Sequence, residues 1–83
     1  MLITRETDYA LRVLRALSDG EQHTAGEISS TQLVPKQFAY KIIKKLDKGG
    51  LVSIARGVDG GCRLAADLRK VTLYDLMTAM EEG

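Results

Sequence analysis

Residues 34–63 read VPKQFAYKIIKKLDKGGLVSIARGVDGGCR and concentrate the positive charge of the chain. Seven of these residues are Lys or Arg and two are Asp, a net charge of +5, whereas the rest of the chain has five basic and nine acidic residues. Such a concentration favours a nucleic acid as the partner. A lysine-rich helix face that is merely solvated would carry the same charge, so charge alone leaves both interpretations open.

The same stretch predicts a helix followed by a β-hairpin. Pro35 stands where a helix tolerates proline, at its first position, and a glycine pair ends the helix after residue 48. The expected buried stripe of this helix consists of Phe38, Ile42, Ile43 and Leu46. Residues 51–55 and 62–65 flank a glycine-containing turn, which predicts two short antiparallel strands.

Three further helices complete the expected fold. An apolar stripe predicts the first over residues 4–18. A capping box at Thr24 begins a short second helix that runs to about residue 31, and Thr72 caps a last helix that runs to the C-terminus. Its expected apolar face is Leu73, Leu76, Met77 and Met80. The order of elements predicts a mainly α fold with a small β-hairpin, a winged helix-turn-helix, as one DNA-binding domain over residues 1–83.

A winged helix-turn-helix makes the polar face of residues 35–48 a candidate recognition surface, because the start of such a helix enters the major groove. The hairpin tip would reach the backbone or the minor groove, where arginine is favoured. A helix N-terminus favours anions, although capping alone accounts for a threonine there. The candidate DNA-binding residues are Lys36, Gln37, Tyr40, Lys41 and Lys44 on the helix, Arg56 and Arg63 on the wing, and Thr24 at the start of the second helix.

The composition gives little support to an enzyme, a secreted protein or a membrane protein. Eighty-three residues, of which 45% are hydrophobic, allow one small core but no enclosed substrate pocket. The sequence has no nucleophile–base pair, no phosphate loop and no pair of carboxylates at useful spacing, so we expect no enzyme. The N-terminus lacks a secretory signal and no apolar run could span a bilayer, so we expect a cytoplasmic protein without a membrane partner.

Three single residues carry two interpretations each. Cys62 could be a redox switch in the wing, or a small apolar residue that covers the core, which the sequence favours. Tyr40 could contact sugar or a base edge, or it could pack on a neighbouring helix. His23 has no second His or Cys at ligand spacing, which favours a surface loop residue over a metal ligand.

Four pieces of the sequence resemble the Rrf2 family of bacterial winged-helix repressors: TRETDYALRVL, PKQFAYKIIKKL, GLVSIARGVDGGCRLA and VTLYDLMTAMEEG. The resemblance covers essentially the whole chain. It implies a repressor that binds a palindromic operator in double-stranded DNA as a homodimer. The family's roles in major-groove reading carry to Gln37, Tyr40 and Lys41, and the role of the wing arginine carries to Arg56. The family often has Glu-Gln where this chain has Tyr40-Lys41, so the operator sequence does not transfer.

Several members of that family hold an iron–sulfur cluster on three cysteines that follow the point where this chain ends. Some also use a ligand in the first helix, at the place of Asp8, which without those cysteines is better interpreted as a charge in the first helical turn. One cysteine cannot supply the thiolates of a cluster. We therefore expect no metal or cofactor in this chain, and a cluster only with residues outside it.

Two alternatives to a complete repressor remain open. The chain could be the DNA-binding fragment of an iron–sulfur or redox sensor, since the long dimerisation helix of the family also lies beyond it. It could instead be a winged-helix protein-interaction module that docks a partner on residues 73–80. Members without a cluster regulate sulfur or cysteine metabolism, sometimes with a metabolic enzyme as partner, and the resemblance extends that possibility to this chain.

Overall fold

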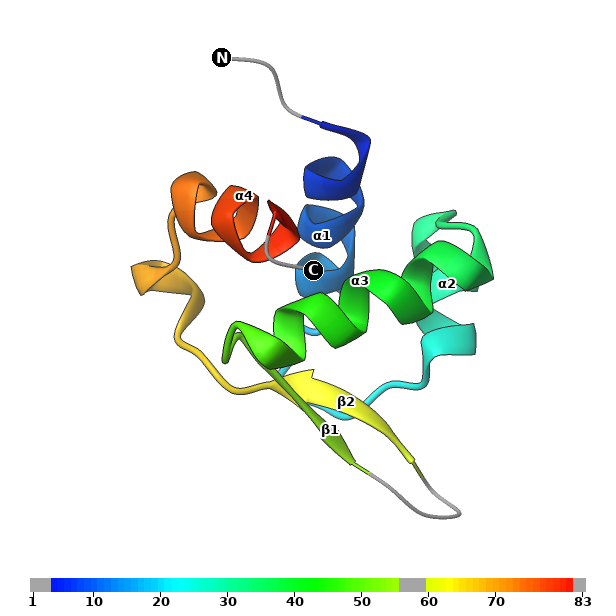
Figure 1. Ribbon diagram of the computed structural model, residues 1–83. Coiled ribbons are helices and arrows are strands. Elements are labelled where there is room, and N and C mark those ends of the chain that lie inside the picture. Colours follow the sequence, from blue (N-terminus) through cyan, green and yellow to red (C-terminus); the bar gives the residue numbers. More distant parts are fainter. Residues whose placement is uncertain (1–3, 56–59, 82–83) are drawn as a thin grey trace.

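The computed structural model describes residues 4–55 and 60–81, and Figure 1 shows how their elements are arranged. The elements are α1 (Arg5–Ala16), α2 (Ala25–Gln32), α3 (Lys36–Lys48), β1 (Val52–Ala55), β2 (Gly61–Leu64), the 3-10 turn η1 (Leu68–Lys70) and α4 (Leu73–Glu81). This order confirms the predicted winged helix-turn-helix, a mainly α fold with a two-stranded hairpin. Among the described residues, η1 and an isolated β-bridge at His23 were not expected from the sequence.

Side-chain caps begin α2 and α4 where the sequence places them. Thr24 Oγ1 accepts a hydrogen bond from the Glu27 amide, and Glu27 Oε1 accepts one from the Thr24 amide, both at 3.1 Å. Thr72 and Asp75 make the same reciprocal pair at the start of α4, at 3.1 and 2.9 Å. Each pair satisfies two backbone donors that a helix start leaves unpaired.

The turn between α2 and α3 is tight, with three residues between the two helices. Leu33 ends α2 in the left-handed conformation, with φ of 55°, and its side chain is exposed. Val34 is buried directly after it, and its amide donates to the Ser29 carbonyl at 3.1 Å. Pro35 is the N-cap of α3 and not its first helical residue, because its ψ of 136° is not helical. The predicted start of this helix is therefore wrong by one residue.

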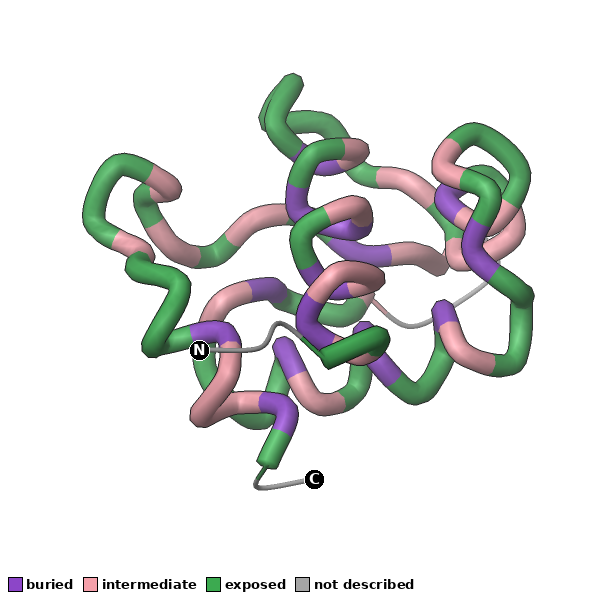
Figure 2. The backbone as a smooth tube through the Cα atoms, turned by 90° about the horizontal axis from the view of Figure 1, so that it is seen from above, coloured by how far each residue is buried: buried purple, intermediate pink, exposed green. Residues whose placement is uncertain are grey.

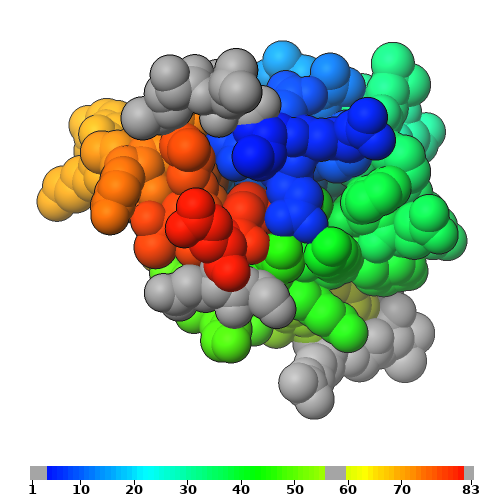
Figure 3. Space-filling model, turned by 45° about the horizontal axis from the view of Figure 1, so that its top comes forward, coloured from blue at the N-terminus to red at the C-terminus, as the bar shows by residue number. Residues whose placement is uncertain are grey.

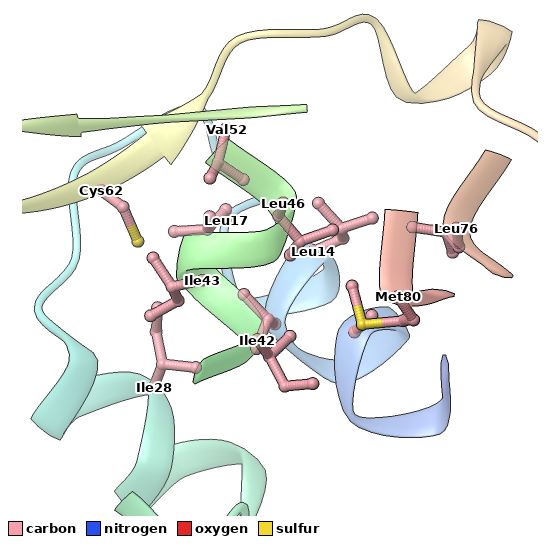
Figure 4. Close-up of a cluster of buried hydrophobic side chains, with 12 residues drawn as sticks. Leu14, Leu17, Ile28, Ile42, Ile43, Leu46, Val52, Cys62, Leu76 and Met80 are labelled. Atoms are coloured by element: carbon pink, nitrogen blue, oxygen red, sulfur yellow. The ribbon is translucent and has the colours of Figure 1, made fainter. Parts of the chain in front are cut away.

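The core lies where α1, α3 and α4 meet, and α2 and the hairpin close it (Figures 1 and 4). Buried and exposed positions alternate along the helices, as amphipathic packing requires (Figure 2). The buried face of α3 consists of Ala39, Ile42, Ile43 and Leu46. Phe38, expected in this stripe, is instead half-buried at its edge, with its ring centroid 5.6 Å from that of Tyr9.

The last helix buries less of its apolar face than the sequence predicts. Leu76 and Met80 are buried against the core, as Figure 4 shows. Leu73 remains exposed and Met77 only half-buried. The expected four-residue stripe of α4 is therefore wrong at these two positions. The side of α4 that packs on the core carries Leu76, Ala79 and Met80.

A single-residue bridge links the hairpin to the loop before α2. Strands β1 and β2 pair antiparallel, with Ile54 opposite Cys62. On the other side of β2, His23 forms an isolated bridge with Cys62. Cys62 is 2% exposed and its sulfur lies over Ile43 in Figure 4, which confirms its interpretation as a small core residue.

Candidate nucleic-acid interface

The solvent-facing side of α3 is polar and mostly basic. A helix that buries Ala39, Ile42, Ile43 and Leu46 turns its opposite side outward. The five residues predicted to bind DNA, Lys36, Gln37, Tyr40, Lys41 and Lys44, are all exposed. The helix has no acidic residue in its first turn, so the end expected to enter the groove is free of negative charge of its own.

Two of these residues line a shared hollow with α2 and the wing. A hollow of about 410 Å³ lies between the three elements. Its lining residues are Thr24, Ala25, Tyr40, Ile43, Lys44, Ile54, Ala55, Gly60, Gly61 and Cys62. The structure thus brings Thr24, Tyr40 and Lys44 together on one surface, although up to twenty residues separate them in the chain.

Thr24 is exposed at the edge of this hollow, but its hydroxyl already serves as the helix cap. A hydroxyl that accepts the Glu27 amide still has a donor proton for an outside oxygen. The neighbouring His23 ring is held by Asp19, with Nε2 to Oδ2 at 2.8 Å, and Nδ1 lies 3.5 Å from Glu27 Oε2. Hydrogen bonding to Asp19, then to Glu27, raises the pKa of His23. The His23 ring therefore lies between Asp19 of its own loop and Glu27 of α2.

Lys41 is not free in this structure. Its ammonium lies 2.8 Å from Glu6 Oε1, and the second carboxylate oxygen of Glu6 accepts from Lys45 at 2.9 Å. Hydrogen bonds from Lys41 and then from Lys45 lower the pKa of Glu6. The first turn of α1 thereby contacts the candidate recognition surface of α3. Reasoning from the sequence missed this contact, because no local pattern links residues so far apart.

Lys45 has a structural role that the sequence did not reveal. Its side chain is 12% exposed, and its ammonium also donates to the Met80 carbonyl at 2.8 Å. The carbonyl belongs to the last turn of α4, where helix carbonyls lack partners and favour a cation. Figure 3 shows the first turns of α1, the end of α4 and α3 gathered on one face of the molecule.

Of the two predicted wing arginines, Arg63 lies in the described part of the chain. Arg63 follows the buried Cys62 on β2 and is exposed, so strand alternation directs it to the opposite side of the hairpin from the core. It does not line the hollow with Tyr40 and Lys44. Arg56 lies outside the described residues.

The described part of the chain has few side chains suited to binding a metal or to redox chemistry. Within residues 4–55 and 60–81, no three His, Cys, Asp or Glu side chains are grouped to hold a metal ion. Burial raises the pKa of the Cys62 thiol to about 11. Asp8, at the place of a first-helix ligand, pairs with Arg12 at 3.4 Å. No helix in the described ranges has both the length and the hydrophobicity to cross a bilayer.

Known proteins resemble this chain in sequence and in fold. The protein aau3 of Rhizobium meliloti (strain 1021) is 34% identical over 85 residues, which cover the whole chain and 55% of that protein. The structure of CymR, the global cysteine regulator of B. subtilis, matches with a TM-score of 0.86 at 21% identity, over all of this chain and 67% of that one. IscR of T. potens matches with a TM-score of 0.79 at 21% identity, over 96% of this chain and 61% of that one.

The two solved structures share the fold with this chain, and the chain spans little more than half the length of aau3. The model of the Rrf2 family, described as an iron-dependent transcriptional regulator, matches residues 3–83. Since that match covers nearly the entire sequence, the chain belongs to the Rrf2 family of transcriptional regulators.

Proposed function

We propose that this chain binds double-stranded DNA in a sequence-specific manner and acts as the DNA-binding part of a transcriptional repressor. The observation that carries the proposal is the convergence of Thr24, Tyr40 and Lys44 on one hollow between α2, α3 and the wing. A winged helix contacts double-stranded DNA through three parts: a helix start, a polar helix face and a hairpin edge.

The exposed residues of α3 have two proposed roles, recognition of base edges and contact with phosphates. Gln37 and Tyr40 stand on the outer face near the start of the helix, where side chains reach base edges, and Gln can bond adenine through two atoms. Lys36 and Lys44 are exposed ammonium groups suited to phosphate contacts, which fix position but carry no sequence information. Arg56 and Arg63 of the wing, with Thr24, complete the proposed backbone and minor-groove contacts.

Binding as a homodimer to a palindromic operator is part of this proposal. A single small winged helix offers few contacts, and regulators of this type gain affinity from two half-sites. The chain spans between 55% and 67% of the lengths of the relatives compared above, so a dimerising segment outside it is compatible with the family. An iron-dependent signal, as in the family's description, would likewise require ligands from outside these residues.

Fluorescence anisotropy on duplexes selected from a random library by the protein itself tests the proposal. Lys44→Ala should weaken binding to all duplexes alike and lower the slope of log affinity against log salt by about 1. Gln37→Ala should cost about 1–3 kcal/mol on the selected duplex and less on random DNA. Lys70→Ala is the matched control, because Lys70 is an exposed lysine of η1 outside the hollow. Equal losses in Lys44→Ala and Lys70→Ala would refute the assigned surface.

A second candidate function, protein docking through α4, is favoured by one observation. Tyr74 is 71% exposed beside the exposed Leu73, so α4 offers an apolar surface to solvent. Docking on this surface would depend weakly on salt, whereas DNA binding weakens steeply as salt rises because counterions are released. Retained binding of a partner at high salt, lost in Tyr74→Ala, would favour this second candidate.

A further inference from the structure

The carboxylate of Glu6 is shared between two lysines that are held very differently. Oε1 accepts from Lys41 at 2.8 Å and Oε2 from Lys45 at 2.9 Å. Lys45 is 12% exposed and has a second partner in the Met80 carbonyl, whereas the Lys41 side chain is 53% exposed. Lys45 therefore fixes Glu6 in place, and Lys41 is the partner that can leave.

One carboxylate can balance only one of the two ammonium groups. The nearly buried Lys45 ammonium needs the negative charge of Glu6 more than the exposed Lys41 ammonium does, because an unpaired charge is costly away from water. The Lys41 ammonium is the surplus charge, and an exposed ion pair of this kind contributes little free energy. Lys41 can therefore exchange the Glu6 oxygen for an external acceptor without disturbing the core.

We propose that Glu6 limits the DNA affinity of the α3 surface, because it holds the Lys41 ammonium in the DNA-free protein and competes with DNA for it. The inference rests on the proposed DNA-binding function. On random DNA, no acceptor is better placed than Glu6, and Lys41 stays with it. On the cognate sequence, a base or phosphate oxygen at the right position takes Lys41, and breaking its pair with Glu6 costs free energy that binding to random DNA does not. Glu6 therefore lowers specific affinity at least as much as non-specific affinity.

Glu6→Gln tests this directly, because glutamine keeps the shape and removes the charge. Affinity should be measured by anisotropy on a random-sequence duplex and on a duplex selected by the wild-type protein. We expect the affinity for random DNA to rise about 2- to 5-fold, the range that an exposed ion pair allows. The salt slope on random DNA should steepen by up to about 0.9, one additional phosphate contact. The gain on the selected duplex should be at least as large, and it should vanish on both duplexes in a Lys41→Gln background.

Asp8→Asn is the matched control, since Asp8 lies in the same first turn of α1 but pairs with Arg12. An equal gain in this variant would attribute the effect to net charge and overturn the proposal. A loss of affinity in Glu6→Gln would also overturn it, because Glu6 would then position Lys41 for DNA.

Lys41→Gln gives an independent readout if Glu6→Gln does not fold. It should weaken binding to the selected duplex more than binding to random DNA, since only the cognate complex engages Lys41. Equal weakening on both duplexes would overturn the role of Glu6 and leave the DNA-binding function intact. Failure of the wild-type protein to bind either duplex would refute the proposed function itself.

Discussion

His23 and Cys62 exchange two backbone hydrogen bonds, from the His23 amide to the Cys62 carbonyl at 2.9 Å and from the Cys62 amide to the His23 carbonyl at 2.8 Å. This pair ties the loop before α2 to the second strand of the wing. It thereby fixes the distance between Thr24 and the hairpin, two of the three parts that border the hollow.

Gly61 permits this close approach, and Gly61→Ala should break it. A β-carbon at position 61 would lie 2.6 Å from the His23 carbonyl oxygen, a backbone atom that cannot move aside cheaply. We expect a loss of roughly 1–3 kcal/mol in the free energy of unfolding, as for other overpacked sites. Urea unfolding followed by circular dichroism measures it.

Gly26→Ala is the matched control for that experiment. Its added carbon would meet only Thr24 Oγ1, at 3.8 Å, within the helix α2. Alanine is the better helix residue by about 0.5–1 kcal/mol, so this variant should be more stable than the wild type. A Gly61→Ala protein as stable as the wild type would contradict the account of the wing attachment.

The His23 side chain should make stability depend on pH near neutrality. Hydrogen bonds to Asp19 and Glu27 raise its pKa above the ordinary value of 6.5. A raised pKa in the folded state means that its stabilisation is complete below pH 6.5 and is lost as the pH rises through the folded pKa. The melting temperature should therefore fall between slightly acid and slightly alkaline pH, and the difference from His23→Gln should shrink over the same range. A constant difference across that range would contradict the expectation.

Cys62 should be chemically inert in the folded protein. Its thiol is buried and has a pKa of about 11, so at pH 8 only about one molecule in a thousand carries the reactive thiolate. A thiol-specific disulfide reagent should react slowly with the native protein and rapidly once urea unfolds it. Rapid reaction without denaturant would restore the redox-switch interpretation.

Replacing Lys45 should destabilise the domain, whereas replacing Lys48 should not. Lys45→Ala removes a nearly buried ammonium that bridges Glu6 and the end of α4, and we expect a cost of about 1–3 kcal/mol. Lys48→Ala removes an exposed lysine of the same last turn, where surface changes stay within about 0.5 kcal/mol. Thermal melts of the two variants side by side measure the difference.

Local sequence signals were enough to predict the order of elements and the exposed residues of α3. Capping residues, helical spacing and the glycine-containing turn each act within a few residues, and the helices and the hairpin follow them closely. The exposed residues Lys36, Gln37, Tyr40, Lys41 and Lys44 were found because a helix that buries one side must expose the other.

Contacts between distant residues could not be predicted in this way. The bridge between His23 and Cys62 involves single residues and leaves no periodic pattern, although the glycine at position 61 is a trace of it. The pairing of Glu6 with Lys41 depends on how α1 crosses α3. The prediction that Phe38 is buried was wrong for the same reason, since its ring packs beside Tyr9 of α1 at the edge of the core.

The most direct test of the central claim is a nitrogen–proton NMR titration of this 9.1 kDa chain with a selected duplex. If α3 reads DNA as proposed, the amide signals of residues 24–26, 36–44 and 60–64 should shift most, while those of α4 should stay nearly unchanged. Shifts concentrated on Leu73–Glu81, with α3 unaffected, would contradict the account and place the binding surface on α4.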